Sequence, residues 1–110
     1  MHKTKQRKLE AHGWRVGSAV DFLGLSPEEA ALVELKLALS QALRARRTDQ
    51  HLSQGALAKR LRSSQSRIAK MEAADRSVSV DLLLKGLFVL GATPRDIAQA
   101  IQKRGRSVAA

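Results

Sequence analysis

The stretch from Leu52 to Glu72, LSQGALAKRLRSSQSRIAKME, restricts the folds open to this chain more than any other segment. Ser53 precedes one short run with apolar residues at helical spacing, and Ser63 and Ser64 precede another. Serine is a favoured residue immediately before a helix, because its hydroxyl accepts a hydrogen bond from a free backbone N–H of the first turn. The stretch therefore predicts two short helices joined by a tight turn.

A longer helix is expected before this pair. Ser26, Pro27 and Glu29 place a capping serine, a proline and an acid where the first turn of a helix favours them. The following leucines recur every three or four residues and are expected to form one buried stripe, namely Leu32, Leu35, Leu39 and Leu43. Arginines crowd the expected last turn, where positive charge is favourable.

Two more helices are predicted after the pair, near residues 80–90 and 94–103, each preceded by a capping Ser or Thr. No segment alternates long enough to make a strand, so the expected fold is an all-α, five-helix bundle. The chain is expected to divide into a partly flexible amino-terminal arm with a short helix at 1–25, a helix-turn-helix domain at 26–104 and a flexible tail at 105–110. One domain accounts for a chain of 110 residues.

Charge indicates the kind of partner. The formal net charge is +10 and the sequence pI is about 11.2, which suggests a polyanion, most simply nucleic acid. A solvated cationic surface is the alternative on charge alone. The chain has no cysteine and no apolar run long enough to span a bilayer. We therefore expect no disulfide, no membrane association and a cytoplasmic location.

The second helix of the pair carries the candidate reading surface. Its inner face is expected to be Ile68 and Met71, packed on Leu57, Ala58 and Leu61 of the first helix. Its outer face is polar and basic, and glutamine can pair with adenine while arginine or lysine donates to guanine. An ordinary solvent-facing helix is the competing interpretation. The residues expected to contact DNA are Gln54, Arg60, Ser64, Gln65, Ser66, Arg67 and Lys70.

These motifs resemble the Xre family of helix-turn-helix proteins, which includes phage Cro and repressor domains. The resemblance rests on Leu-Ser-Gln-x-x-Leu-Ala-x-x-Leu at 52–61 and Ser-Gln-Ser-x-Ile-x-x-x-Glu at 64–72, and extends over about 43–92. It implies a five-helix bundle in which Arg47 pairs with Glu72 as a structural strut. Arg62 departs from the family, because the turn there often has glycine. Gly55 is a further departure, weakening the first turn of its helix.

The amino-terminal part, with Gly-Trp-x-Val-Gly at 13–17, resembles a subgroup of Xre proteins. Many members are antitoxins of the HigA kind, from type II toxin–antitoxin operons. That resemblance implies a repressor of its own operon that neutralises a RelE/HigB-type endoribonuclease toxin. Trp14 and Val16 are the candidate contacts with such a partner or a second subunit, although Trp14 docked on its own domain is an equal alternative.

Other functions remain open or are disfavoured. A stand-alone phage-type or chromosomal regulator without a toxin is the alternative function, and a non-specific nucleic-acid binder is a third. A homodimer on a duplex operator is expected, formed through the last two helices. Their apolar residues exceed the apparent needs of the bundle, although a place in the core for all of them is the alternative: Leu83, Leu87, Phe88, Ile97 and Ile101. His2, His12 and His51 show no ligand spacing, and catalytic motifs are missing. We expect no enzyme activity, metal or cofactor.

Overall fold

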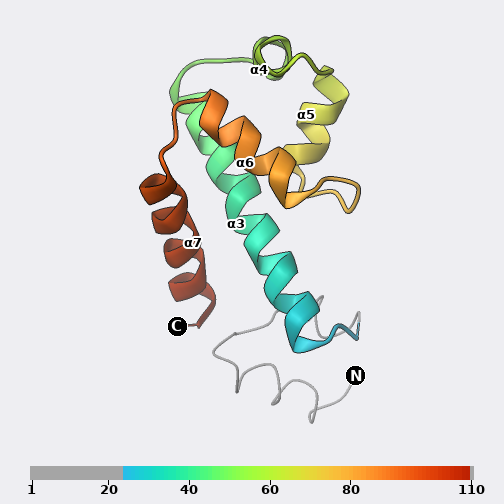
Figure 1. The fold of residues 1–110 in the computed structure, drawn as a ribbon, viewed down its shortest axis with the longest axis vertical. Helices are drawn as coiled ribbons and strands as arrows, with labels where there is room; N and C mark the ends of the chain where they lie inside the picture. The colour runs from blue at the N-terminus through green and yellow to red at the C-terminus, as the bar shows by residue number, and fades with distance from the viewer. Residues whose placement is uncertain (1–23, 110) are drawn as a thin grey trace.

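The structure is a computed structural model that describes residues 24–109, with side chains described for residues 24–104. The described part contains no strand, and the all-α, five-helix expectation is confirmed. Figure 1 shows the long helix α3 as the axis of the fold, with the other helices arranged around it. The helices are α3 (Pro27–Asp49), α4 (Gln54–Leu61), α5 (Gln65–Glu72), α6 (Val80–Val89) and α7 (Pro94–Ala109).

Local capping chemistry sets the amino ends of these helices. The Glu29 backbone N–H donates to the Ser26 hydroxyl at 3.2 Å, and the Ser26 N–H donates to the Glu29 carboxylate at 3.1 Å. Thr93 and Asp96 make the same reciprocal pair at the start of α7. Each pair satisfies two backbone donors that no helical carbonyl can reach. The predicted starts of α3 and α7 are therefore confirmed.

The core lies where α3 meets the other helices. Helix α3 contacts α5, α6 and α7, while α4 packs on α5 and α6. Leu43 of α3 lies against Gly86 of α6. A Cβ added at Gly86 would stand only 3.0 Å from Leu43 Cδ1, so this contact leaves little room for a side chain. The largest fully buried apolar side chains are Leu39, Leu43, Leu57, Ile68, Met71, Val78, Leu83 and Leu87.

The expected leucine stripe of α3 is wrong at one end. Leu39 and Leu43 are buried and Leu35 is partly buried, but Leu32 is 49% exposed. The amino-terminal half of α3 projects beyond α4, α5 and α6, as Figure 1 shows. Leu32 therefore has the right spacing for a buried stripe, but α4, α5 and α6 do not extend far enough to cover it, although α7 still contacts this half of α3 through Arg104 and Glu34.

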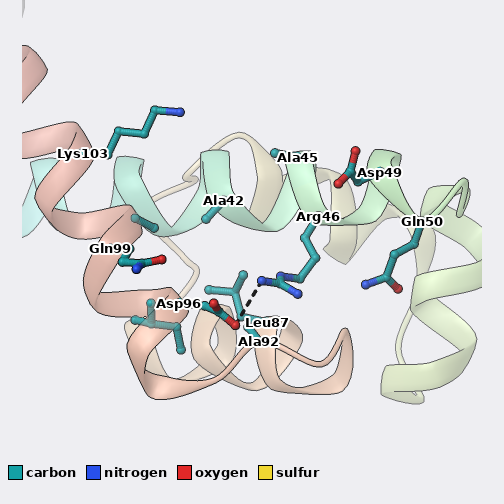
Figure 2. Close-up of a pocket in the computed structure, with 12 residues that line it drawn as sticks. Ala42, Ala45, Arg46, Asp49, Gln50, Leu87, Ala92, Asp96, Gln99 and Lys103 are labelled. Carbon is teal, nitrogen blue, oxygen red and sulfur yellow. Dashed lines mark ion pairs between the residues drawn. The ribbon is translucent and has the colours of Figure 1, made fainter.

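Polar contacts hold α7 against α3. Arg46 forms an ion pair with Asp96 at 3.3 Å beside a hollow between the two helices (Figure 2). The Thr93 backbone N–H, then the Thr93 hydroxyl and nearby arginines, hold the pKa of Asp96 below its usual value. Further along, Arg104 donates to the buried carboxylate of Glu34 at 2.9 Å. Helix α7 extends to Ala109, past its expected end near Lys103.

The apolar residues that suggested a dimer contact serve mainly the core. Leu83, Leu87 and Ile97 are buried, and Ile101 packs on the core from its edge. Phe88, by contrast, is 49% exposed. Four of the five residues therefore serve the core, in line with the core alternative, and only Phe88 stays available for a contact with a second copy. Trp14, Val16 and the short helix expected before residue 24 lie outside the described residues.

Candidate nucleic-acid interface

The two short helices, α4 and α5, are fixed at their amino ends by serine caps. The Ser53 hydroxyl accepts the Ala56 N–H at 3.0 Å, and the Ser64 hydroxyl accepts the Arg67 N–H at 3.1 Å. The sequence left Ser63 and Ser64 as alternatives for the second cap, and the structure selects Ser64. Ser64 and Ser66 also share a hydrogen bond at 3.2 Å, so the first turn of α5 is held by its own short side chains.

Helix α5 separates a buried face from a polar one. Ile68 and Met71 are fully buried against the core. The remaining candidate positions are exposed to solvent, namely Ser64, Gln65, Ser66, Arg67 and Lys70. Because the buried Ile68 and Met71 fix the orientation of α5 about its own axis, these polar side chains point away from the bundle. Hydrogen-bonding groups of this kind on an exposed helix face can reach base edges in a DNA major groove.

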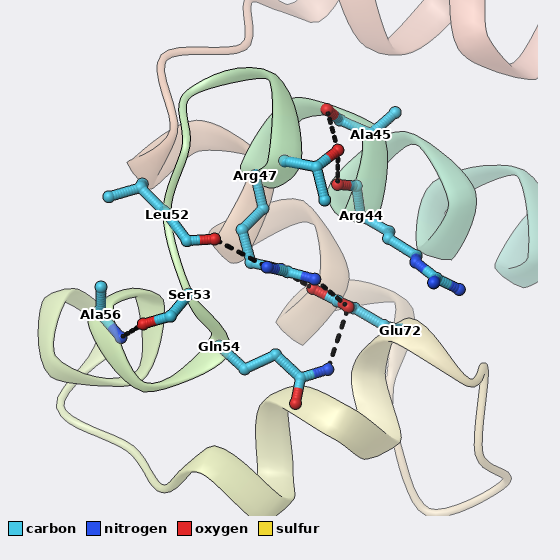
Figure 3. Close-up of polar contacts among 9 residues, drawn as sticks. Arg44, Ala45, Arg47, Leu52, Ser53, Gln54, Ala56 and Glu72 are labelled. Atoms are coloured by element: carbon cyan, nitrogen blue, oxygen red, sulfur yellow. Dashed lines mark hydrogen bonds and ion pairs between the residues drawn. The ribbon is translucent and has the colours of Figure 1, made fainter.

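A polar network anchors this helix pair to α3, as Figure 3 shows. Arg47 donates through Nε and Nη2 to the two carboxylate oxygens of Glu72, and through Nη1 to the Leu52 carbonyl at 2.7 Å. Both side chains of the ion pair are largely buried, at 12% exposed for Arg47 and 5% for Glu72. The hydrogen bonds to Glu72 raise the pKa of Arg47. The pair joins the end of α3, the start of α4 and the end of α5.

Gln54 joins the same network. Its Nε2 donates to Glu72 Oε1 at 3.1 Å. A carboxylate only accepts, so Glu72 fixes which way the amide points. Among the described residues, the second N–H of this amide has no acceptor, which leaves it available to a DNA phosphate. The sequence placed Gln54 at the start of α4, but the spacing alone did not reveal that Glu72 orients it.

Positive charge surrounds the exposed face of α5. Arg60 and Arg62 are exposed at the end of α4, close in sequence to the Ser64 cap. Between Asp49 and Glu72 the sequence contains no acidic residue. Asp75, just after α5, accepts the backbone N–H and the hydroxyl of Ser77, which lowers its pKa. Asp75 therefore stays ionised beside this surface, and the charge of Lys70 contributes to its lowered pKa.

Two further observations apply to residues 24–109 alone, the part of the chain that the structure describes. No group of three or more His, Cys, Asp or Glu side chains gathers there in a way that could hold a metal ion. None of the described helices combines the length and apolar character needed to cross a membrane.

Comparison with known families supports the interpretation drawn from this geometry. A family model described as helix-turn-helix matches residues 43–97, which is half of the chain. The matched region contains α4, α5, α6 and the Arg47–Glu72 pair. Searches of curated proteins and of solved structures gave no match. The chain therefore belongs to the Xre-type helix-turn-helix family and carries a DNA-binding transcription-regulator domain.

Proposed function

We propose that this protein is a sequence-specific repressor that reads a duplex operator with α5. The observation that carries the proposal is the set of exposed polar side chains on α5, opposite the buried Ile68 and Met71. A regulatory DNA-binding domain also accounts for the net charge of +10 better than an enzyme would. Repression follows if the bound protein covers a promoter.

The candidate residues divide by chemistry into readers and anchors. Gln65 offers a donor and an acceptor, which match the major-groove edge of adenine, while Lys70 can donate to guanine. Ser64, Ser66 and Arg67 lie at the helix end, where short or cationic side chains suit bases or phosphates. Arg60 and Gln54 are assigned to phosphates, which orient the protein without reading sequence.

Substitution separates these two roles. Gln65→Ala is expected to cost about 1–3 kcal/mol of binding free energy at one base position and to relax specificity there. Arg60→Ala is expected to weaken binding to every duplex and to reduce the salt dependence of binding. Fluorescence anisotropy on a selected operator and its single-base variants measures both effects. Gln102→Ala, on an exposed glutamine of α7, is the matched control. Equal weakening of all duplexes by Gln65→Ala would contradict the reading role.

A homodimer is proposed through α6. Phe88 and Val89 are exposed, and they line a shallow hollow with Leu84, Asp81 and Lys85. An apolar patch that carries one acid and one base is suited to pairing with its own copy about a two-fold axis. Two copies would present two α5 helices to two half-sites of an operator.

Phe88→Glu is expected to convert the dimer to a monomer, because it places an unpaired charge in the contact. Sedimentation velocity measures the mass, and operator binding should weaken in parallel. Leu32→Glu is the matched control, since Leu32 is equally exposed, at 49%, in the part of α3 that projects beyond α4, α5 and α6. A dimer that survives Phe88→Glu would exclude this contact.

The antitoxin role is the finer form of the proposal, with a stand-alone regulator as the alternative. It is supported by the amino-terminal resemblance and by residues 27–42 of α3, which lie outside the family match and expose Leu32. Trp14 and Val16 are the proposed partner contacts. Co-expression with the adjacent reading frame tests the role: relief of growth arrest and co-purification would support it. Operator binding without either effect would favour the stand-alone regulator.

A further inference from the structure

The turn between α4 and α5 has an unusual residue at its centre. Arg62, the residue after α4, adopts a left-handed conformation with φ 53° and ψ 49°. The Arg62 N–H donates to the Lys59 carbonyl at 3.2 Å, and the Ser63 N–H donates to the Ala58 carbonyl at 2.8 Å. These bonds end α4 and start the turn, so the left-handed conformation is required by the backbone. Glycine adopts it most readily, because it has no Cβ to crowd the backbone.

No contact that the Arg62 side chain makes within the described residues explains why arginine occupies this position. The side chain is exposed, and it makes no hydrogen bond or ion pair with another described residue. Glycine would form the same two backbone hydrogen bonds with less strain. His51 and Ala74 also adopt positive φ among the described residues, so the feature that distinguishes Arg62 is its exposed guanidinium next to the cap of α5.

The position of Arg62 indicates a use for this guanidinium. It stands two residues before Ser64, the cap of α5, and two residues after Arg60. A guanidinium here borders the amino end of the proposed reading helix. Its planar fork of N–H donors matches two oxygens of one phosphate. No acidic residue lies between Asp49 and Glu72 in the sequence, and no ion pair among the described residues engages this guanidinium.

We propose that Arg62 is a phosphate-contacting residue of the DNA interface, retained at a strained turn position for its guanidinium. The inference rests on the proposed operator-binding function and adds a residue to it. It also implies that position 62 affects stability and DNA binding in opposite directions. Glycine would suit the left-handed turn better than arginine, but it would remove a contact with DNA.

Arg62→Gly tests both halves of this statement in the whole chain of 110 residues. The midpoint of thermal unfolding is expected to rise by about 2–5 °C, because glycine relieves the left-handed strain. Affinity for a duplex is expected to fall about eightfold at 0.1 M salt, and the slope of log affinity against log salt should become shallower by about 0.9, as for the loss of one phosphate contact. Circular dichroism and anisotropy titrations over a range of salt concentrations measure these changes.

Two matched variants isolate the cause. Ala74→Gly changes another left-handed residue, with φ 54°, and should raise stability without changing affinity. Lys103→Gln removes an exposed charge from α7 and should leave the salt slope nearly unchanged. Arg62→Lys keeps the charge but loses the planar fork, so it should keep the salt slope while recovering only part of the affinity. If Arg62→Gly binds duplexes with unchanged affinity and slope, the inference is overturned while the operator function stands. If the wild-type protein binds no duplex, both fail together.

Discussion

Glu72→Ala is expected to lower the free energy of unfolding by about 3–5 kcal/mol, because it leaves the guanidinium of Arg47 largely buried without its carboxylate. Such a loss is a large share of the stability of a small domain. The substitution also removes the acceptor of Gln54 and the strut that joins α3 to α5. Its effect on folding should therefore be larger than that of any substitution of an exposed polar residue.

Urea unfolding followed by circular dichroism measures this loss. Asp49→Ala, which removes an exposed acid from the same region, is the control and should change stability by less than about 0.5 kcal/mol. The double variant Arg47→Met with Glu72→Leu should recover most of the lost stability, since it leaves no unpaired buried charge. A Glu72→Ala protein as stable as the wild type would show that the ion pair contributes little.

Leu43→Ala is expected to destabilise the domain by about 2–5 kcal/mol. Leu43 is fully buried, and its methyl group lies where α3 meets the bare backbone of Gly86. Truncation therefore opens a cavity at the crossing of two helices, which a tightly packed core cannot fully close.

The same helix supplies a strict control for this prediction. Leu32→Ala removes the same atoms from α3, but Leu32 is 49% exposed, so its loss should cost less than about 1 kcal/mol. The difference in unfolding free energy between the two variants measures burial directly. Similar losses at both positions would contradict the placement of Leu32 outside the core.

Much of the secondary structure could be predicted because the signals are local. Ser26 with Glu29, and Thr93 with Asp96, form their reciprocal caps within one helical turn. Ser53 likewise caps the residue three positions ahead. Hydrogen bonds that close over so short a distance depend little on the rest of the fold. Periodicity also predicted the inner faces of α4 and α5.

Burial at the ends of the bundle could not be predicted in this way. Leu32 and Leu43 belong to the same repeat of leucines every three or four residues along α3, yet Leu32 is exposed and Leu43 is fully buried. Leu83, Leu87 and Ile97 looked surplus to one bundle, but α3 covers them. Spacing shows which residues share a face of a helix, and the packing of the other helices decides whether that face is covered.

The stretch from Leu52 to Glu72 by itself determined two capped helices, an inner apolar face and an outer polar one, because each depends on contacts within a few residues. Only the tertiary structure showed that Glu72 orients Gln54 at 3.1 Å and that Arg62 lies in a left-handed turn. The first contact joins residues far apart in the sequence. The second arises because the chain must reverse sharply while α4 and α5 pack on the same core. Neither feature can be predicted from the neighbouring residues alone, since both depend on how the helices pack.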